Sequence, residues 1–168
     1  MPSMFPGMYA DPNDPNRRPR TPAGDPDTWP ASLRWSYWLS VAAAIVMVLA
    51  GLVMLTENPQ AASDANPGAG RDLIEAFRGN LRFVGIANII TGLLIAALAA
   101  QLRSGSRLSR RILLVVIALA VFLNVVAFAI QVGGLAMILI VILLALAAFL
   151  MFRPDANHYV AYKTDAEH

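Results

Sequence analysis

The polar side chains that could do chemistry within the apolar segments of this chain are few, and all of them are neutral. Apart from residues at segment ends, they are Ser36, Ser40, Asn88, Thr91, Asn124 and, at a turn, Gln131. Amides and hydroxyls exchange hydrogen bonds, whereas proton relays and ion pathways inside a membrane use ionisable residues. We therefore expect interhelical polar contacts from Asn88, Thr91 and Asn124, and no catalytic residue.

Asn88 and Asn124 have matching positions in their segments. At about 1.5 Å of helix rise per residue, Asn88 lies about 8 Å after residue 83 and Asn124 about 9 Å before residue 130. In antiparallel helices the two amides would share one depth, so we predict an Asn88–Asn124 hydrogen bond, with Thr91 as a further partner. Such contacts hold membrane helices together by about 0.6–2 kcal/mol each. The alternative is that one amide faces a partner protein or a lipid carbonyl.

The residue types that serve most enzymes and metal sites are missing or isolated. The chain has no cysteine, which excludes thiol catalysis, thiolate metal sites and disulfides. His158 and His168 lack ligand spacing. No glycine-rich phosphate loop, H-E-x-x-H motif or convergent Ser/His/Asp set is present. We expect a protein that is not an enzyme and has no cofactor or metal, and a net charge of +2 gives no argument for nucleic acid.

Charge distribution predicts the fold. Of 168 residues, 57% are hydrophobic and 14% charged, against about 25% charged in a typical soluble domain. The uncharged stretches are 35–56, 83–102 and 112–152. About 20 apolar helical residues cross a bilayer core, so the third stretch must fold back, at the glycines that follow Gln131. We predict an all-α polytopic membrane protein, a four-transmembrane-helix bundle with spans at about 35–56, 83–102, 112–130 and 135–152.

Small residues recur along three of these spans and favour close packing of the helices. The stripes are Ser36, Ser40, Ala43 and Ala50 with Met47; Gly85, Asn88, Gly92, Ala96 and Ala99; and Ala120, Asn124, Ala127 and Gln131. The fourth span is dominated by bulky aliphatic residues, so we expect it to be the most exposed to lipid or to a partner.

The segments outside the spans have three different compositions. Residues 1–34 hold eight of the 11 prolines and predict a disordered cytoplasmic tail, with Thr21 and Thr28 as phosphorylation candidates if the tail has a role. The outer loop 57–82 contains a predicted amphipathic helix at 71–82, which either rests on the membrane or forms a partner surface. Residues 153–168 are predicted to be a cytoplasmic C-terminal tail.

Basic residues set the expected orientation. The loop between the second and third spans carries four arginines and no acid: Arg103, Arg107, Arg110 and Arg111. Basic loops stay in the cytoplasm, so we predict a multi-pass protein of the bacterial plasma membrane with both termini cytoplasmic and an uncleaved first span. The same four arginines are candidates for contacts with anionic lipid headgroups, unless they determine topology alone. Trp35, Tyr37 and Trp38 are the expected interface anchors.

Three local patterns carry a family resemblance. They are the entrance Trp35-Ser36-Tyr37-Trp38-Leu39, the loop from Leu102-Arg103-Ser104-Gly105 to Arg110-Arg111-Ile112-Leu113, and the exit Pro154-Asp155-Ala156-Asn157-His158-Tyr159. In this layout the chain resembles the small four-span membrane proteins of actinobacteria with a Pro-rich cytoplasmic N-terminal tail and no assigned activity. The resemblance covers about residues 30–160 and implies no activity, cofactor or catalytic residue.

The absence of charge within the spans, together with their packing faces, leads to a functional hypothesis. We expect a non-catalytic accessory or scaffold subunit of a larger plasma-membrane assembly, such as an envelope-synthesis or respiratory complex, acting through helix packing and its cytoplasmic tail. The alternative is a small oligomeric transporter or lipid-handling protein, whose polar path only Asn88, Thr91, Asn124 and Gln131 could line. Expected partners are membrane lipids and either other integral membrane proteins or further copies of the chain.

Overall fold

The structure, a computed structural model, describes residues 29–57, 64, 67–68, 70–104, 106–157 and 159. Its long helices are α1 (Ala31–Thr56), α3 (Arg71–Ala100), α4 (Arg107–Ala129) and α5 (Leu135–Met151), and the 3₁₀ turn η1 (Gln101–Ser104) continues α3. No strand occurs in this described part, so the predicted all-α class is confirmed there. The candidates Thr21, Thr28, His158 and His168 lie outside it, as does the proline-rich tail up to residue 28.

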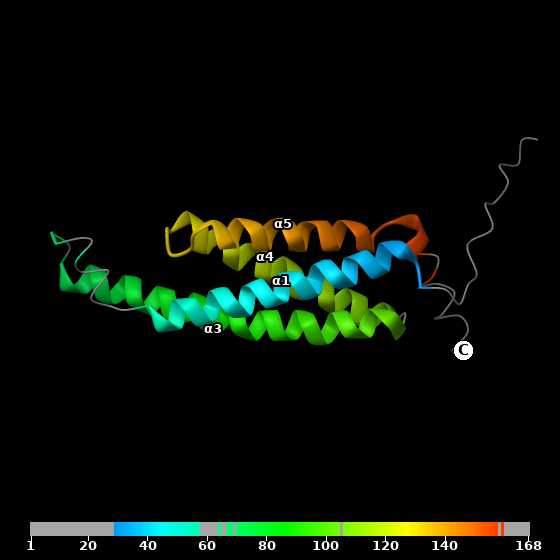
Figure 1. Cartoon of the computed structure of the whole chain (residues 1–168), viewed down its shortest axis with the longest axis horizontal. Coiled ribbons are helices and arrows are strands. Elements are labelled where there is room, and N and C mark those ends of the chain that lie inside the picture. Colours follow the sequence, from blue (N-terminus) through cyan, green and yellow to red (C-terminus); the bar gives the residue numbers. More distant parts are fainter. Residues whose placement is uncertain are drawn as a thin grey trace, which may run out of the picture.

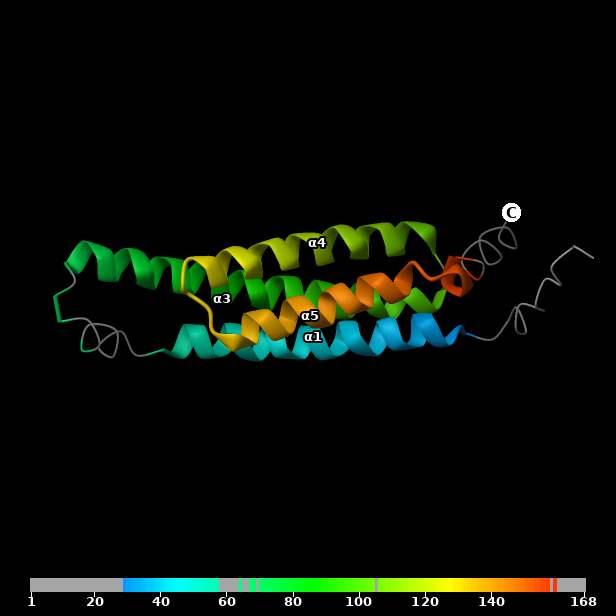
Figure 2. The same ribbon diagram turned by 90° about the horizontal axis from the view of Figure 1, so that it is seen from above.

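The helices run alternately up and down around a ring. α1 packs against α3 and α5, and α4 packs against the same two helices (Figures 1 and 2). The starts of α1 and α4 and the ends of α3 and α5 therefore meet at one end of the bundle, which we call the arginine end. The opposite end, called the turn end, holds the end of α1, the start of α3 and the turn between α4 and α5.

Three of the four long helices have the length that a bilayer requires, and the outside of the bundle is apolar. α1, α3 with η1, and α4 are each long and apolar enough to cross a membrane, while α5 is a shorter apolar helix of 17 residues. Large apolar side chains cover the outside of the bundle, among them Val115 and Phe122 on α4, which are 67% and 64% exposed. Surfaces this apolar are rare on soluble monomers, so the exterior indicates a membrane protein.

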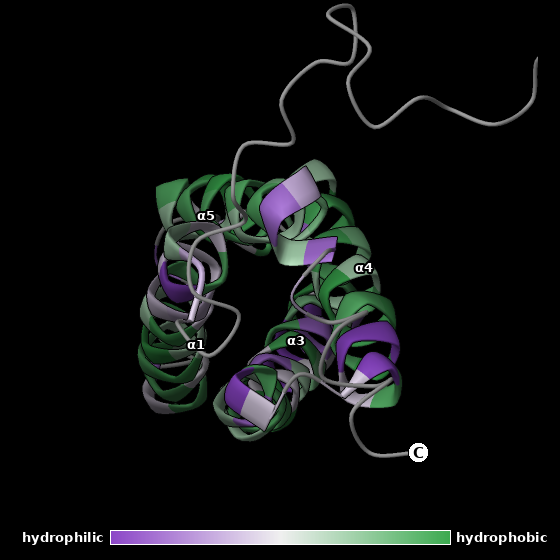
Figure 3. Ribbon diagram, turned by 90° about the vertical axis from the view of Figure 1, so that its right-hand side faces the viewer, coloured by the Kyte–Doolittle hydropathy of each residue, from purple (hydrophilic) through white to green (hydrophobic). Residues whose placement is uncertain are grey.

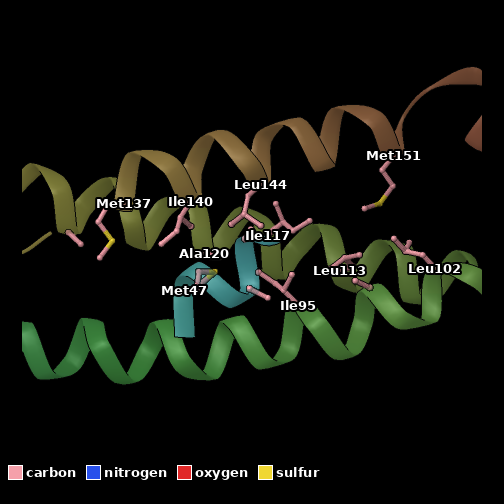
Figure 4. Packing of buried hydrophobic residues seen from close by; sticks show 14 of the residues in the cluster. Met47, Ile95, Leu102, Leu113, Ile117, Ala120, Met137, Ile140, Leu144 and Met151 are labelled. Atoms are coloured by element: carbon pink, nitrogen blue, oxygen red, sulfur yellow. The ribbon is translucent and has the colours of Figure 1, made fainter. Parts of the chain in front are cut away.

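Buried side chains from all four helices fill the interior. Figure 4 shows Met47 of α1, Ile95 of α3, Ile117 of α4 and Leu144 of α5 pointing into the same space. All four are at most 3% exposed. The buried residues of α5 are Met137, Ile140, Leu144, Ala147 and Met151. The helix in which the sequence shows mainly bulky aliphatics thus contributes to the core as its neighbours do.

α1 and α3 come closest at a pair of glycines. A Cβ atom added to Gly51 would lie 2.5 Å from the carbonyl oxygen of Gly85, and one added to Gly85 would lie 3.0 Å from that of Gly51. Two turns along α3, a Cβ atom on Gly92 would lie 3.1 Å from the carbonyl oxygen of Ala44. The predicted small-residue face of α3 is therefore the contact face. On α1 the buried residue at this level is Gly51, while Ala50, the residue in the predicted stripe, is only half-buried.

The reversal between α4 and α5 falls where the sequence predicts it, but a different residue makes it. Gln131, not a glycine, has the left-handed backbone, with φ 61°. The amide of Val132 donates to the carbonyl of Ala127 at 3.0 Å, and that of Gln131 donates to the carbonyl of Phe128 at 3.1 Å. These two bonds form the Schellman motif that ends many helices. Gly133 makes room for packing instead, since a Cβ there would lie 2.3 Å from Cγ of Met137.

The segment 71–82 forms the first turns of α3 and not a separate helix. It extends beyond the turn between α4 and α5 (Figure 1), by about 18 Å for 12 residues at 1.5 Å each. A helix that rests in the membrane plane would need a break before a span, and α3 has none at this point. The segment therefore continues the direction of the span. We call it the α3 extension.

The glycine contact yields a stability prediction. Gly51→Ala should destabilise the protein by about 1–3 kcal/mol, because the new methyl group meets a backbone oxygen that cannot move aside. Gly79→Ala is the matched control: a Cβ there meets nothing within 4 Å, so helix propensity should leave stability equal or up to about 1 kcal/mol higher. Thermal unfolding in mild detergent measures both. Equal midpoints for the two variants would contradict the close approach.

Candidate functional site

A buried polar layer joins three helices near the turn end. The amide nitrogen Nδ2 of Asn124 on α4 donates to Oδ1 of Asn88 on α3 at 3.0 Å, which is the hydrogen bond that the sequence predicts. Nδ2 of Asn88 donates in turn to Sδ of Met137 on α5 at 3.8 Å, a weak contact because a thioether is a poor acceptor. The exposed fractions of Asn88 and Asn124 are 3% and 0%.

The orientation of the Asn124 amide is determined by its neighbours. Its Nδ2 also donates to the carbonyl of Ala120 at 2.8 Å, one turn earlier on α4. The flipped amide would turn its oxygen toward two other oxygens, so the nitrogen must face Asn88 and Ala120. This leaves Oδ1 of Asn124 buried, with no hydrogen-bond partner among the described residues. A buried acceptor of this kind is the one unsatisfied position in the layer.

The remaining polar side chains of the set have separate roles. Thr91 is buried, but its hydroxyl donates to the carbonyl of Ala87 in its own helix at 2.6 Å, and so it does not join the Asn88–Asn124 contact as a third partner. Ser36 of α1 donates to the carbonyl of Ala147 of α5 at 2.8 Å. Oγ of Ser40 is buried without a partner in the described part of the chain. Gln131 is exposed in the turn.

At the arginine end, Arg110 is engaged within the protein. Its Nη2 donates to the carbonyl of Met151, and its guanidinium lies over the ring of Phe152, 5.2 Å from the ring centroid. The last carbonyls of a helix lack partners within it, and a cation there complements the negative end of the helix dipole. Arg110 therefore caps α5, a role that differs from the lipid contact expected from the sequence.

The chain after α5 packs back on this end for several residues. Residues 154–157 form a helical turn, and Ala156 and Tyr159 are buried. The hydroxyl of Tyr159 donates to the carbonyl of Arg103 in η1 at 3.2 Å. Residues 154–157 and Tyr159, which the sequence places in the predicted tail, therefore belong to the folded unit. Two buried side chains three residues apart are too short a pattern to reveal this packing from the sequence.

The other arginines of the predicted set are exposed, and the fold adds two more. Arg103, Arg107 and Arg111 have exposed side chains, and Arg107 makes an interaction of its own. Arg34 at the start of α1 and Arg153 after α5 are also exposed at the same end. The predicted topology already puts both residues on the same side as the loop between α3 and α4, and the up-and-down order of the helices brings them to one end of the bundle.

These residues can exchange hydrogen bonds between helices and concentrate positive charge at one end. Among the described residues, no group of three or more His, Cys, Asp or Glu could hold a metal ion. Comparison of the chain with family models, curated proteins and solved structures found no match.

The asparagine contact can be tested by a double-mutant cycle. Asn88→Ala and Asn124→Ala should show a coupling energy of about 0.6–1.7 kcal/mol, because either change alone removes their shared hydrogen bond. The control cycle pairs Asn88→Ala with Ser36→Ala, whose hydroxyl bonds to Ala147 instead, and should be additive within about 0.5 kcal/mol. Unfolding in detergent supplies the energies. Additivity in both cycles would contradict the contact.

The contacts of Arg110 with Met151 and Phe152 lead to a second testable prediction for this region. Arg110→Gln should lower the free energy of unfolding by about 1–3 kcal/mol, since it removes a charged hydrogen bond and the contact with Phe152. The neighbouring Arg111→Gln changes an exposed side chain and should stay within about 0.5 kcal/mol of the parent protein. Thermal unfolding at equal detergent concentration distinguishes them. Matching losses would mean that Arg110 does not cap the helix.

Proposed function

We propose that the chain is a non-catalytic accessory or scaffold subunit of a larger plasma-membrane assembly. The observation that carries the proposal is the α3 extension, in which a single helix continues beyond the turn between α4 and α5 (Figure 1). Most of its residues are exposed, whereas Leu81 at its base belongs to the core. Scaffolding needs an anchored body and an accessible surface, and this helix supplies a direct mechanical link between the two.

The proposal includes four spans with both termini in the cytoplasm. α5 has 17 residues, or about 25 Å of helix at 1.5 Å per residue, against a core of about 30 Å. Local thinning of the bilayer accommodates a mismatch of this size at modest cost. Exposed apolar side chains along α5, such as Ile142 and Phe149, support contact with lipid. The arginines at the start of α1, in η1 and at the start of α4 favour the cytoplasm for that end.

The polar layer supports a structural role for the interior. Asn88, Asn124 and Ser36 each bond to a neighbouring helix, so their polar atoms stabilise the bundle. The stretches 35–56, 83–102 and 112–152 carry no formal charge, and transport pathways are normally marked by ionisable groups. The second candidate, a small oligomeric transporter or lipid-handling protein, is favoured by one observation: the unpaired, buried Oδ1 of Asn124.

The α3 extension has the features of a partner surface. Leu73 is 66% exposed, and Arg71, Asp72 and Glu75, all within two residues of it, are exposed. An exposed apolar side chain close to charges of both signs has the composition of a protein–protein contact surface, whereas an anionic lipid surface would favour basic residues alone.

Photo-crosslinking in native membranes tests this function. A crosslinking amino acid at position 73 should capture one protein in reproducible stoichiometry, and that protein should also co-purify with the unlabelled chain in mild detergent. The control places the crosslinker at position 122, on the apolar exterior of α4, where lipid adducts are expected. Recovery of the chain only with copies of itself, or solute movement by the purified chain in liposomes, would support the second candidate and overturn the scaffold.

A further inference from the structure

Charge is strongly segregated between the two ends of the bundle. The described charged residues at the arginine end are Arg34, Arg103, Arg107, Arg110, Arg111, Arg153 and a single acid, Asp155. Those at the turn end, including the α3 extension, are Glu57, Asp64, Arg71, Asp72, Glu75, Arg78 and Arg82. One end is therefore strongly basic, while the other mixes both signs. This asymmetry agrees with the predicted topology, and it also gathers exposed arginines from several segments at one end.

Of the six arginines at this end, Arg110 and Arg107 have interactions within the protein, and the other four are exposed. Arg110 is half-buried and bonded to Met151, so its charge serves α5. Arg34, Arg103, Arg111 and Arg153 are exposed and come from four different segments. Figure 3 looks onto this end along the bundle. Hydrophilic ribbon lies at the helix ends that face the viewer, and the helices behind them are mainly hydrophobic.

Aromatic side chains indicate the level at which the arginine end would lie in a bilayer. Trp35 and Trp38 are 61% and 58% exposed on the first turns of α1, beside Arg34. Trp29 and Tyr37 pack against each other with ring centroids 5.7 Å apart, and Tyr37 contacts Trp38 at 5.2 Å. Exposed indole rings prefer the headgroup level of a bilayer. The neighbouring guanidinium groups are therefore held at the level of lipid phosphates, with which they form forked hydrogen bonds.

We propose that the arginine end binds the headgroups of anionic phospholipids through Arg34, Arg103, Arg111 and Arg153. The inference rests on the membrane placement of the bundle, but it requires no protein partner and no particular assembly. A row of bound headgroups would give this end a preference for anionic lipid over zwitterionic lipid of the same chain length. The preference must weaken with salt, because exposed charges are screened.

Tryptophan fluorescence offers a selective test, because all three tryptophans lie at this end, between residues 29 and 38. The full-length chain is reconstituted in vesicles containing either brominated phosphatidylglycerol or brominated phosphatidylcholine, which quench nearby indoles. Quenching gives the relative affinity for the two lipids. We expect phosphatidylglycerol to be preferred, and the preference to fall by up to about a hundredfold in the variant R34Q/R103Q/R111Q, since each of the three arginines contributes about fivefold near an anionic surface.

Three controls make the result decisive. R71Q/R82Q removes arginines from the turn end and should keep the full preference. Thermal unfolding must show that the triple variant remains folded, as expected for exposed positions. Inorganic phosphate, compared with chloride at equal ionic strength, should not reverse the quenching. An equal affinity for both lipids, an unchanged preference in R34Q/R103Q/R111Q, an equal loss in R71Q/R82Q, or reversal by phosphate would each overturn the proposal.

The outcome is independent of the scaffold function. A lipid preference that depends on these arginines, in a chain that captures no partner at position 73, would refute the scaffold alone. Stoichiometric partners without any lipid preference would refute the lipid site alone.

Discussion

The constraint on which this structure depends is that a bilayer core offers no hydrogen-bonding partner. Backbone amides and carbonyls must then pair within the chain, and helices achieve this without any neighbour. Several polar side chains of the uncharged stretches are paired in the same way. Thr91 bonds to its own helix, whereas Asn88 and Asn124 bond to each other. Oδ1 of Asn124 and Oγ of Ser40 are the buried atoms of these stretches that have no partner among the described residues.

Lipid also removes the hydrophobic drive that packs soluble helices, so contact has to come from shape and from hydrogen bonds. The two strongest instances lie on α3. Its glycine face lets the backbone of α1 approach at Gly51, and its Asn88 holds α4 and contacts α5. α3 therefore organises the bundle. α3 is also the helix that continues outside the bundle, so the α3 extension is joined to the packed core by one uninterrupted helix.

The helix ends are closed in different ways at the two ends of the bundle. At the turn end, a Schellman motif with Gln131 in a left-handed conformation closes α4 at a strained residue. At the arginine end, η1, Arg110 and Tyr159 close the helix ends with contacts between segments far apart in the sequence. The remaining arginines and the tryptophans at this end are of the residue types that are most favourable at a membrane interface.

The sequence by itself determined the helical class, three of the apolar helices as candidate spans, the position of the reversal before α5 and the pairing of Asn88 with Asn124. These features follow from the absence of charged residues in the spans, from the rise per residue of a helix and from the position of each amide along its helix. All three can be read along the chain without knowing how the helices pack. Only the tertiary structure decided that Gly51 forms the close contact, that Arg110 caps α5 and that Tyr159 returns to η1. Each of these depends on the rotation of one helix against another or on the meeting of distant segments, and no periodicity along the chain encodes either.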